Sequence, residues 1–313
     1  MTEIEWDAVI VGGASAGLSA ALMLGRARRR VLVLDSGLPR NRVAPHMHGV
    51  LGRDGTSPLQ LVADGRSELE RYGVEIRQVH VTDVAPTDHG YVVVTANGDR
   101  EPARRVLIAT GIRDRLPAIN GLAEQWGTGA VVCPYCDGWE VRDRRIAVIA
   151  NDPLAPAHAQ MLRQWSNDVT YFPRSDFPLE ESDRAKLVAR DIRIDERKIV
   201  GVDAVDGELR ALVLADSSEF EVDSIFIRPM STPIDEMVSS LALDRNEAFG
   251  GSWIAVDAMG KTSAPGVWAA GNVTNPGASV PVAMAAGTMA GAAINHDLIE
   301  EEIELAVAQA SRA

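Results

Sequence analysis

Two short apolar runs in the first forty residues predict neighbouring buried strands. Residues 7–11 read Asp-Ala-Val-Ile-Val and residues 31–34 read Val-Leu-Val-Leu. Continuous runs of this kind are typical of parallel strands that are covered on both faces. A glycine turn at 12–17 and a helical stretch from Leu18 to about Ala27 lie between them. The order of strand, glycine turn, helix and strand predicts a βαβ unit.

A hairpin follows in the same segment. Residues 91–95 and 105–109 are rich in β-branched side chains and lie on either side of Asn97-Gly98, a strong turn signal. The second run ends at Ala109-Thr110-Gly111. We therefore expect these three residues at the end of a strand.

The pattern starts again beyond residue 115. Apolar strands are predicted at 146–149 and 169–172, with a helix at 157–165 between them. The remaining predicted elements are strands at 200–205 and 209–214 around the turn Asp206-Gly207, a strand at 225–227, and a linker at 228–233.

An inserted domain accounts for this order. Residues 266–272, Gly-Val-Trp-Ala-Ala-Gly-Asn, lead to a long Ala/Gly-rich helix that begins near Pro281. The sequence thus predicts an α/β fold with two Rossmann-like three-layer domains. One domain is discontinuous, over 1–114 and 236–313, and the other is inserted at 115–235.

Composition and charge exclude several classes of function. The 313 residues include 44 acidic and 31 basic side chains, which gives a net charge of −13. This charge repels phosphate backbones and anionic lipid, so we expect neither nucleic-acid nor membrane binding. No apolar run reaches the roughly 18 residues of a membrane span. Residues 1–5 are acidic and predict no signal peptide, which favours a cytoplasmic protein.

The first glycine loop has the pattern of a dinucleotide site. Gly12 permits a tight turn, Gly17 permits close packing of helix and sheet, and the free amides of the helix start attract a pyrophosphate. Asp35 lies 18 residues after Gly17, where a carboxylate accepts ribose hydroxyls. A purely structural turn is the alternative. The predicted binding residues are Gly12, Ala14, Ser15, Ala16, Gly17 and Asp35, with Ala14 replacing the middle glycine.

Two cysteines, Cys133 and Cys136, are the sharpest chemical signal, in the order Cys-Pro-Tyr-Cys. A Cys-x-x-Cys pair at a helix start has a lowered thiol pKa and forms a reducible disulfide. Asp137 follows and could shuttle protons to the leaving thiol. Zinc would need about four ligands, which scattered histidines such as His46 and His48 supply poorly. Inert buried thiols are the other alternative, and no metal site is predicted.

Together these motifs closely resemble the low-molecular-weight thioredoxin reductase family over nearly the whole chain. The resemblance rests on the dinucleotide loop, the Cys-Pro-Tyr-Cys-Asp-Gly box, Ala109-Thr110-Gly111 and Gly266–Asn272. It implies a homodimeric oxidoreductase with a discontinuous FAD domain and an inserted NADPH-type domain that carries the redox cysteines.

The resemblance also implies a role for each matching residue. The adenosine diphosphate half of FAD would lie on the first glycine loop and Asp35. Cys136 would face the flavin, Cys133 would exchange with the substrate, and Asp137 would be the acid/base. Asn272 stands where the family usually has Asp. The remaining residues assigned to FAD are Ala109, Thr110, Gly111, Gly271 and Asn272, with the backbone of Pro281 and Val282 facing the flavin ring.

Two further segments resemble one subgroup of the family. Pro39-Arg40-Asn41 and the stretch 48–55, His-Gly-Val-Leu-Gly-Arg-Asp-Gly, are similar to segments of the dithiol oxidases of gliotoxin and holomycin biosynthesis. The resemblance implies that Arg40, Asn41 and His48 line the flavin. Ordinary polar loops are the alternative interpretation.

The second glycine loop is missing from the inserted domain. Residues 150–155 read Ala-Asn-Asp-Pro-Leu-Ala, where NADPH-dependent members need Gly-x-Gly-x-x-Ala/Gly. Ala150 disfavours the required turn, Asp152 places a carboxylate in the pyrophosphate position, and Pro153 removes an N–H donor. The basic motif for the 2′-phosphate retains Arg174 alone, because Ser175 and Leu179 fill the other two basic positions.

These departures decide between the candidate functions. The favoured hypothesis is an FAD-dependent dithiol oxidase that forms a disulfide in a small dithiol and passes the electrons to O₂, giving H₂O₂. The alternative is a thioredoxin-disulfide reductase, with a thioredoxin-like partner, fed by NAD(P)H or by another carrier such as ferredoxin. A non-enzymatic, flavin-binding redox sensor is the third hypothesis.

Overall fold

The computed structural model describes residues 6–312, and the acidic stretch 1–5 lies outside the described residues. The chain forms two compact units. Unit 1 contains residues up to Arg42, Leu59–Arg113 and the residues from Ser231 on; unit 2 contains Val43–Pro58 and Asp114–Met230. The sequence predicts an uninterrupted first segment, 1–114. Residues 43–58 instead cluster with unit 2, where Val43 packs so tightly on Gly127 that a Cβ there would lie 2.5 Å from the valine side chain.

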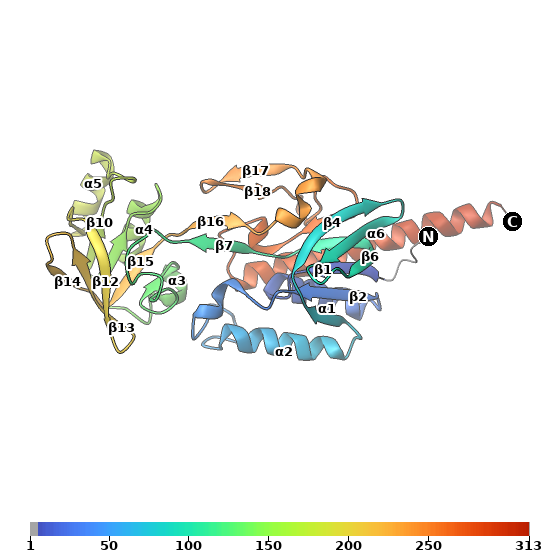
Figure 1. Cartoon of the computed structure of the whole chain (residues 1–313), viewed down its shortest axis with the longest axis horizontal. Helices are drawn as coiled ribbons and strands as arrows, with labels where there is room; N and C mark the ends of the chain where they lie inside the picture. Colours follow the sequence, from blue (N-terminus) through green and yellow to red (C-terminus); the bar gives the residue numbers. More distant parts are fainter. Residues whose placement is uncertain (1–5, 313) are drawn as a thin grey trace. The chain divides into compact units, whose positions relative to one another are not determined.

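A mixed seven-stranded sheet forms the centre of unit 1 (Figure 1). Its order is β3-β2-β1-β6-β5-β4, with β19 also paired to β6. Strand β1 runs parallel to β2 and β6, whereas β4 and β5 form antiparallel pairs. The bounds are β1 Trp6–Val11, β2 Val31–Asp35, β3 Glu75–Gln78, β4 Val81–Thr87, β5 Gly90–Thr95, β6 Arg100–Ile108 and β19 Val267–Ala269.

Helices pack on this sheet through small residues. Helix α1, Ser15–Arg26, lies against α6, Val280–Ala310. A Cβ at Gly287 of α6 would lie 2.0 Å from the carbonyl oxygen of Ala16, so the two backbones approach too closely for any larger residue. The other elements of unit 1 are α2 Pro58–Glu70, η1 Arg40–Val43, η2 Glu236–Leu241, η3 Gly271–Val273 and the hairpin β17 Arg245–Ala248 and β18 Gly251–Ile254.

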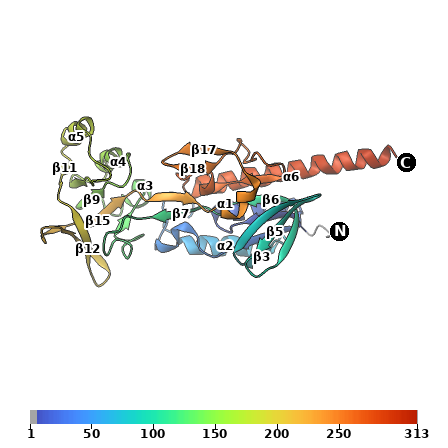
Figure 2. The ribbon, with the colours of Figure 1, turned by 45° about the horizontal axis from the view of Figure 1, so that its top comes forward.

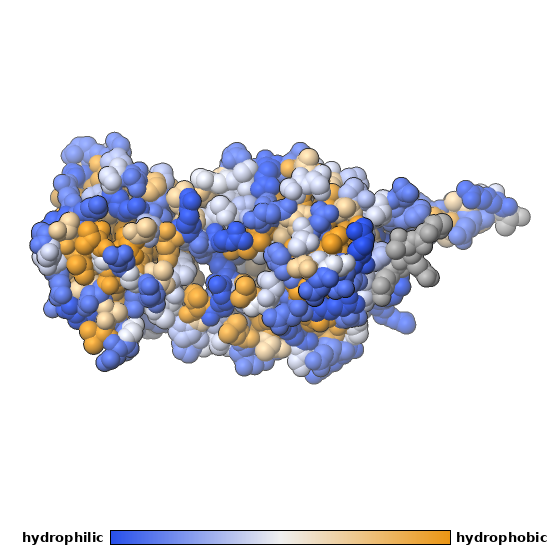
Figure 3. Space-filling view, viewed as in Figure 1, coloured by the Kyte–Doolittle hydropathy of each residue, from blue (hydrophilic) through white to orange (hydrophobic). Residues whose placement is uncertain are grey.

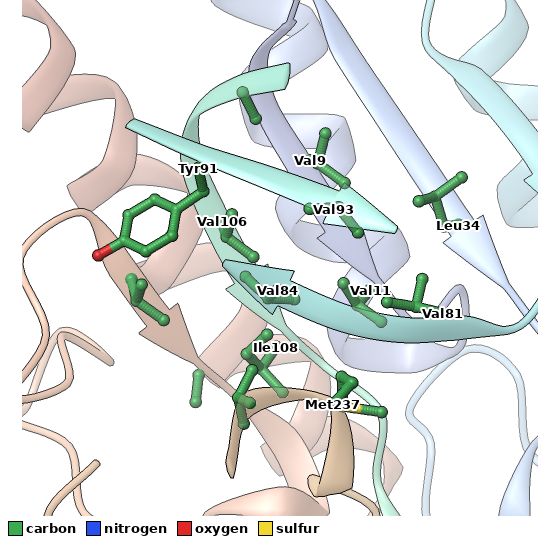
Figure 4. Packing of buried hydrophobic residues seen from close by; sticks show 14 of the residues in the cluster. Val9, Val11, Leu34, Val81, Val84, Tyr91, Val93, Val106, Ile108 and Met237 are labelled. Carbon is green, nitrogen blue, oxygen red and sulfur yellow. The ribbon is translucent and has the colours of Figure 1, made fainter. Parts of the chain in front are cut away.

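The two faces of the unit 1 sheet carry separate apolar cores. Figure 4 shows one of them, where side chains from β1, β4, β5 and β6 point toward one another, with Met237 of η2 at the edge. The hairpin predicted around Asn97-Gly98 is formed by β5 and β6, which pair antiparallel and contribute Val93 and Val106 to this core. The other core lies under α1 and α6 and contains the buried Trp268.

The last turns of α6 extend beyond the sheet of unit 1 (Figures 1 and 2). Figure 3 shows that the exposed end of this helix is mostly hydrophilic on the face in view. Glutamates at its base join an arginine cluster, in which Arg104 contacts Asp7 at 3.0 Å, Glu301 at 2.8 Å and Glu302 at 2.9 Å. Within residues 6–312, no helix has the length and apolar character that crossing a membrane requires.

A five-stranded parallel sheet of order β11-β10-β9-β15-β8 forms the core of unit 2, beside a three-stranded antiparallel sheet, β12-β13-β14. The expected linker at 228–233 is wrong in part, because Met230–Pro233 form β16, whose backbone groups pair with β7, Ile112–Arg115. The bounds in unit 2 are β8 Ala130–Val131, α3 Pro134–Asp137, β9 Ile146–Ile149, α4 Ala155–Leu162, β10 Val169–Phe172, α5 Glu181–Val188, β11 Arg193–Ile194, β12 Ile199–Val205, β13 Glu208–Leu214, β14 Glu219–Glu221 and β15 Ser224–Ile227.

Candidate active site

The first glycine loop forms a close-packed cradle between β1 and α1. Gly12 has φ +106°, and a Cβ there would lie 2.4 Å from the carbonyl oxygen of Ala109. A Cβ at Gly17 would lie 1.8 Å from the carbonyl oxygen of Gly12. Helix α1 then begins after Ala14, with no side chain of the described residues capping its first turn. Its first amide groups are therefore available to an anion such as a pyrophosphate.

Asp35 lies at the end of β2 and closes one side of this cradle. Its side chain is buried, and its Oδ1 accepts a hydrogen bond from the Gly13 amide at 3.0 Å. Arg66 Nη2 of α2 donates to Asp35 Oδ2 at 2.5 Å. Arg66 has no sequence motif of its own, because it meets Asp35 only once α2 packs on the sheet. Each carboxylate oxygen has a second lone pair, so both can still accept a ribose hydroxyl.

Segments far apart in the sequence complete the cradle. Gly111 and Gly271 have φ near +75° and +82°, and a Cβ at Gly271 would lie 3.0 Å from the Ala16 side chain. Thr110 Oγ1 is buried, and it has no hydrogen-bond partner in the part of the chain that the structure describes. Buried polar atoms are rarely left unpaired in native proteins, so this orphan hydroxyl is itself evidence for a bound polar group.

The other residues expected at the cofactor lie in unit 1, with one exception. Asn272 Nδ2 donates to the carbonyl oxygens of Asn275, Pro276 and Ala278, at 3.1, 3.2 and 3.0 Å, and so fixes the loop before α6. Pro281 and Val282 form the first turn of α6. Arg40 and Asn41 lie in η1. His48, by contrast, clusters with unit 2.

The redox pair lies at the start of α3 in unit 2. Cys133 and Cys136 form a disulfide with their Cα atoms 5.2 Å apart. Cys133 is the residue before the helix, Pro134 occupies the first turn, and the amides of Cys136 and Asp137 donate to the Cys133 carbonyl oxygen at 3.0 and 3.1 Å. The turn holds the two sulfur atoms at bonding distance.

Asp137 is the acid next to this disulfide. Burial and, to a lesser extent, the negative charge of Glu140 raise the pKa of its carboxyl to about 6, while His48 acts in the opposite direction. The group therefore changes charge near neutral pH. A carboxyl of this kind can take up or release a proton as a thiol pair opens and closes.

The chain's own side chains fill the second glycine-loop position, between β9 and α4. Asp152 Oδ1 accepts a hydrogen bond from the amide of Leu154 at 3.1 Å, and Arg228 Nε donates to Asp152 Oδ2 at 2.6 Å. The ion pair with Arg228, the arginine after β15, offsets the negative charge that the sequence places in this position. The Asp152 carboxylate thus engages both the Leu154 amide and the Arg228 guanidinium in this position.

Arg174, the remaining residue of the basic motif, is also engaged. Its Nη1 donates to Asn151 Oδ1 at 2.6 Å, and its Nη2 lies 3.2 Å from Asp176. The adjoining cavity, which Arg115 and Phe177 also line, has a volume of about 250 Å³. Ligand pockets of small molecules usually measure roughly 300–1,000 Å³. The volume of this hollow lies just below that range.

Comparison with known proteins identifies the family. The family model described as "Pyridine nucleotide-disulphide oxidoreductase" matches residues 6–287. The chain belongs to this family. It is 31% identical over 307 residues to "Thioredoxin reductase sirT" of Leptosphaeria maculans, with 93% of each chain covered. The resemblance to thioredoxin reductases is thereby confirmed.

Solved structures of this oxidoreductase family share the whole fold. The structure of HlmI has a TM-score of 0.93 and 41% identity, over 98% of this chain and 96% of that chain. The oxidoreductase from Agrobacterium tumefaciens has a TM-score of 0.89 and 37% identity, over 95% and 99% of the two chains. The predicted α/β class with two Rossmann-like units is confirmed, and the protein is an FAD-dependent redox enzyme.

FAD fits the cradle of unit 1 on the observations given above. The two glycines leave no room for side chains at the turn, the first amides of α1 are open to the pyrophosphate, and Thr110 supplies an unpaired hydroxyl. The assignment of single residues to FAD, including Arg40, Asn41 and His48, stays a prediction. Sequence reasoning missed Arg66, Glu140 and Arg228; Glu140 alone had a signal, three residues after Asp137.

Proposed function

We propose that this protein is an FAD-dependent dithiol oxidase that closes a disulfide in a small dithiol substrate. The observation that carries the proposal is the Asp152–Arg228 pair in the second glycine-loop position. An enzyme that takes electrons from NADPH needs that position for the pyrophosphate. The similarity to HlmI, and the segments that resemble the dithiol oxidases, support placing the chain in that subgroup.

The cysteine pair performs the exchange in two steps. A substrate thiolate attacks Cys133 Sγ, the Cys133–Cys136 bond breaks, and Cys136 leaves as the thiolate. The second substrate thiolate then attacks the substrate sulfur bound to Cys133, which closes the substrate disulfide and releases the Cys133 thiolate. The substrate loses two electrons and two protons, and the cysteine pair gains the electrons.

In this mechanism Asp137 donates or accepts one of these protons. Its carboxyl, with a pKa raised to about 6 by burial, lies directly after Cys136 in the chain. Protonated Asp137 stabilises the departing Cys136 thiolate, and the ionised form can receive the proton of the incoming thiol. When bound, FAD supplies the two-electron acceptor for the reduced cysteine pair, and O₂ takes the electrons and protons as H₂O₂.

An anaerobic titration of the holoenzyme tests the proposal. We expect a small dithiol such as dithiothreitol to bleach the flavin absorbance, whereas NADPH leaves it unchanged. Oxygen consumption should follow when air is admitted, with one H₂O₂ formed per disulfide. Rapid bleaching by NADPH would overturn the proposal in favour of a thioredoxin-type reductase. Cys136→Ser should retain FAD and lose dithiol oxidation.

Two further features belong to the proposal. We propose a homodimer, as the family resemblance implies, which sedimentation of the holoenzyme measures directly. We also propose a cytoplasmic location, because both cysteines of the chain form the redox pair and none remains for structural disulfides.

A further inference from the structure

A folded loop of unit 2 brings an imidazole to the redox helix. The loop begins at Met47, whose amide donates to the Thr56 carbonyl oxygen at 3.0 Å, while the Gly55 amide donates back to the Met47 carbonyl oxygen at 2.9 Å. Met47 and Val50 of this loop are buried. The loop therefore has a defined backbone conformation, which its own hydrogen bonds hold.

His48 lies between two carboxylates at the start of this loop. Its Nδ1 lies 3.3 Å from Asp54 Oδ2, and its Nε2 lies 3.4 Å from Glu140 Oε1. The other oxygen of Asp54 accepts a hydrogen bond from the Gly49 amide at 2.8 Å, so Asp54 is itself fixed. The His48 side chain is 24% exposed. The ring is thus held by a carboxylate on each side, Asp54 in the loop and Glu140 just after α3.

Glu140 connects this arrangement to the redox acid. It follows Asp137 by three residues, and its negative charge disfavours ionisation of Asp137, while the charge of His48 favours it. Besides burial, these are the two groups that act on Asp137, and Asp54 faces the far nitrogen of His48. An imidazolium beside Glu140 cancels part of the field at the acid.

We propose that His48 is a positioning residue for the redox site: the loop 47–56 holds its imidazole against Glu140 and so sets the charge that faces Asp137. The inference rests on the proposed function, in which Asp137 is the acid/base for the cysteine pair.

Two opposite variants test the proposal on the holoenzyme. The readout is the pH profile of the rate at which dithiothreitol reduces the bound FAD, measured by anaerobic stopped flow. In His48→Gln, Glu140 stays charged without compensation, so the midpoint of the acid limb should move to higher pH. In Glu140→Gln the midpoint should move to lower pH, and the double variant should lie near the wild type.

His46→Gln is the matched control. His46 lies in the same segment, but its Nδ1 contacts the Gly55 carbonyl oxygen at 3.1 Å. Its profile should stay at the wild-type midpoint. If His48→Gln slowed reduction equally at every pH, with an unmoved midpoint, the proposed role would be wrong and the residue merely structural.

A second readout needs no turnover. Infrared difference spectra against Asp137→Asn report the protonated carboxyl of Asp137 during a pH titration. Its midpoint should rise in His48→Gln and fall in Glu140→Gln, and equal midpoints in both variants would overturn the inference. Failure of every dithiol to reduce the wild-type flavin would instead refute the proposed oxidase, while the infrared titration still decides the role of His48.

Discussion

Arg228 Nε donates a hydrogen bond to Asp152 Oδ2 at 2.6 Å, across 76 residues of sequence. The other oxygen of the same carboxylate accepts a hydrogen bond from the Leu154 amide in the turn just before α4. The arginine offsets the charge of the carboxylate in the second glycine-loop position.

Asp152→Ala should cost stability without restoring a nucleotide site. It removes the ion-pair partner of Arg228 and the acceptor of the Leu154 amide, and we expect a loss of about 1 kcal/mol in the free energy of unfolding, because both side chains of the ion pair are partly exposed. Dithiol oxidation should stay unchanged. Urea unfolding and the anaerobic NADPH titration measure the two effects.

Asp176→Ala is the control for that variant. Asp176 pairs with Arg174 at the same edge of the sheet, but its side chain is 68% exposed. Its removal should change stability by less than about 0.5 kcal/mol. Flavin bleaching by NADPH in Asp152→Ala would show that one carboxylate alone closes the site, contrary to this expectation.

Asp137→Asn should make the fold more stable above neutral pH and lower the activity. The folded pKa of Asp137 is raised to about 6 by burial, above the ordinary 3.8, so the ionised group destabilises the fold. This cost is fully present above pH 6 and disappears as the pH falls toward 4. The variant should gain on the order of 2 kcal/mol at pH 8 and nothing at pH 4.

Turnover of Asp137→Asn should fall by about 10²-fold, as is typical when a general acid is removed. Asp143→Asn is a suitable control, because Asp143 lies beyond the redox helix at a turn with φ +61°. Equal unfolding free energies of Asp137→Asn and wild type at pH 8 would contradict the raised pKa.

Local patterns predicted most of the fold. The apolar runs that became β1, β2, β9 and β10 are too short and too continuous to be anything but buried strands. Asp206-Gly207, with both residues at positive φ, forms the turn that its sequence demands. The affiliation of residues 43–58 could not be predicted, because it depends on how Val43 packs against Gly127.

For the candidate site too, residues within one motif could be predicted, and residues that act through distant partners could not. Gly12 and Cys133 belong to contiguous motifs, and the structure gives each the geometry that its motif requires. Arg66 and Arg228 act through partners on other elements, and no spacing rule connects them to Asp35 or Asp152. Ion pairs between distant elements leave no local signal, since many surface arginines have the same immediate neighbours.

Gly17→Ala should abolish FAD binding. A methyl group at Gly17 would lie 1.8 Å from the Gly12 carbonyl oxygen, so α1 must move away from the sheet and its first amides lose their alignment. Purified protein should lack flavin absorbance, and the lost packing should cost about 3 kcal/mol of stability.

Gly98→Ala separates this effect from ordinary glycine strain. Gly98 has φ +88° in the β5–β6 turn, and a Cβ there would have no neighbouring atom within 4 Å among the described residues. It should cost about 1 kcal/mol and keep its FAD. A yellow Gly17→Ala protein with normal flavin content would refute the cradle assigned to this loop.

Arg104→Ala should destabilise unit 1 by about 2–3 kcal/mol at neutral pH. Arg104 is 16% exposed and holds Asp7, which is 12% exposed, together with Glu301 and Glu302 of α6. Arg29 and Arg104 lower the pKa of Glu302 to about 2, so this pairing stabilises the fold above the ordinary value near 4.5 and is lost as the pH falls toward 2.

The deficit of Arg104→Ala should therefore shrink as the pH is lowered from 7 to 3, when the wild type loses the same interactions. Urea midpoints across this range give the comparison. Arg113→Ala is the surface control, because Arg113 and Glu236 are 64% and 66% exposed at a separation of 3.4 Å, and it should change stability by less than about 0.5 kcal/mol. If Arg104→Ala lost no more stability than Arg113→Ala, the charged cluster would contribute little, and the apolar contacts with α1 alone would hold α6 in place.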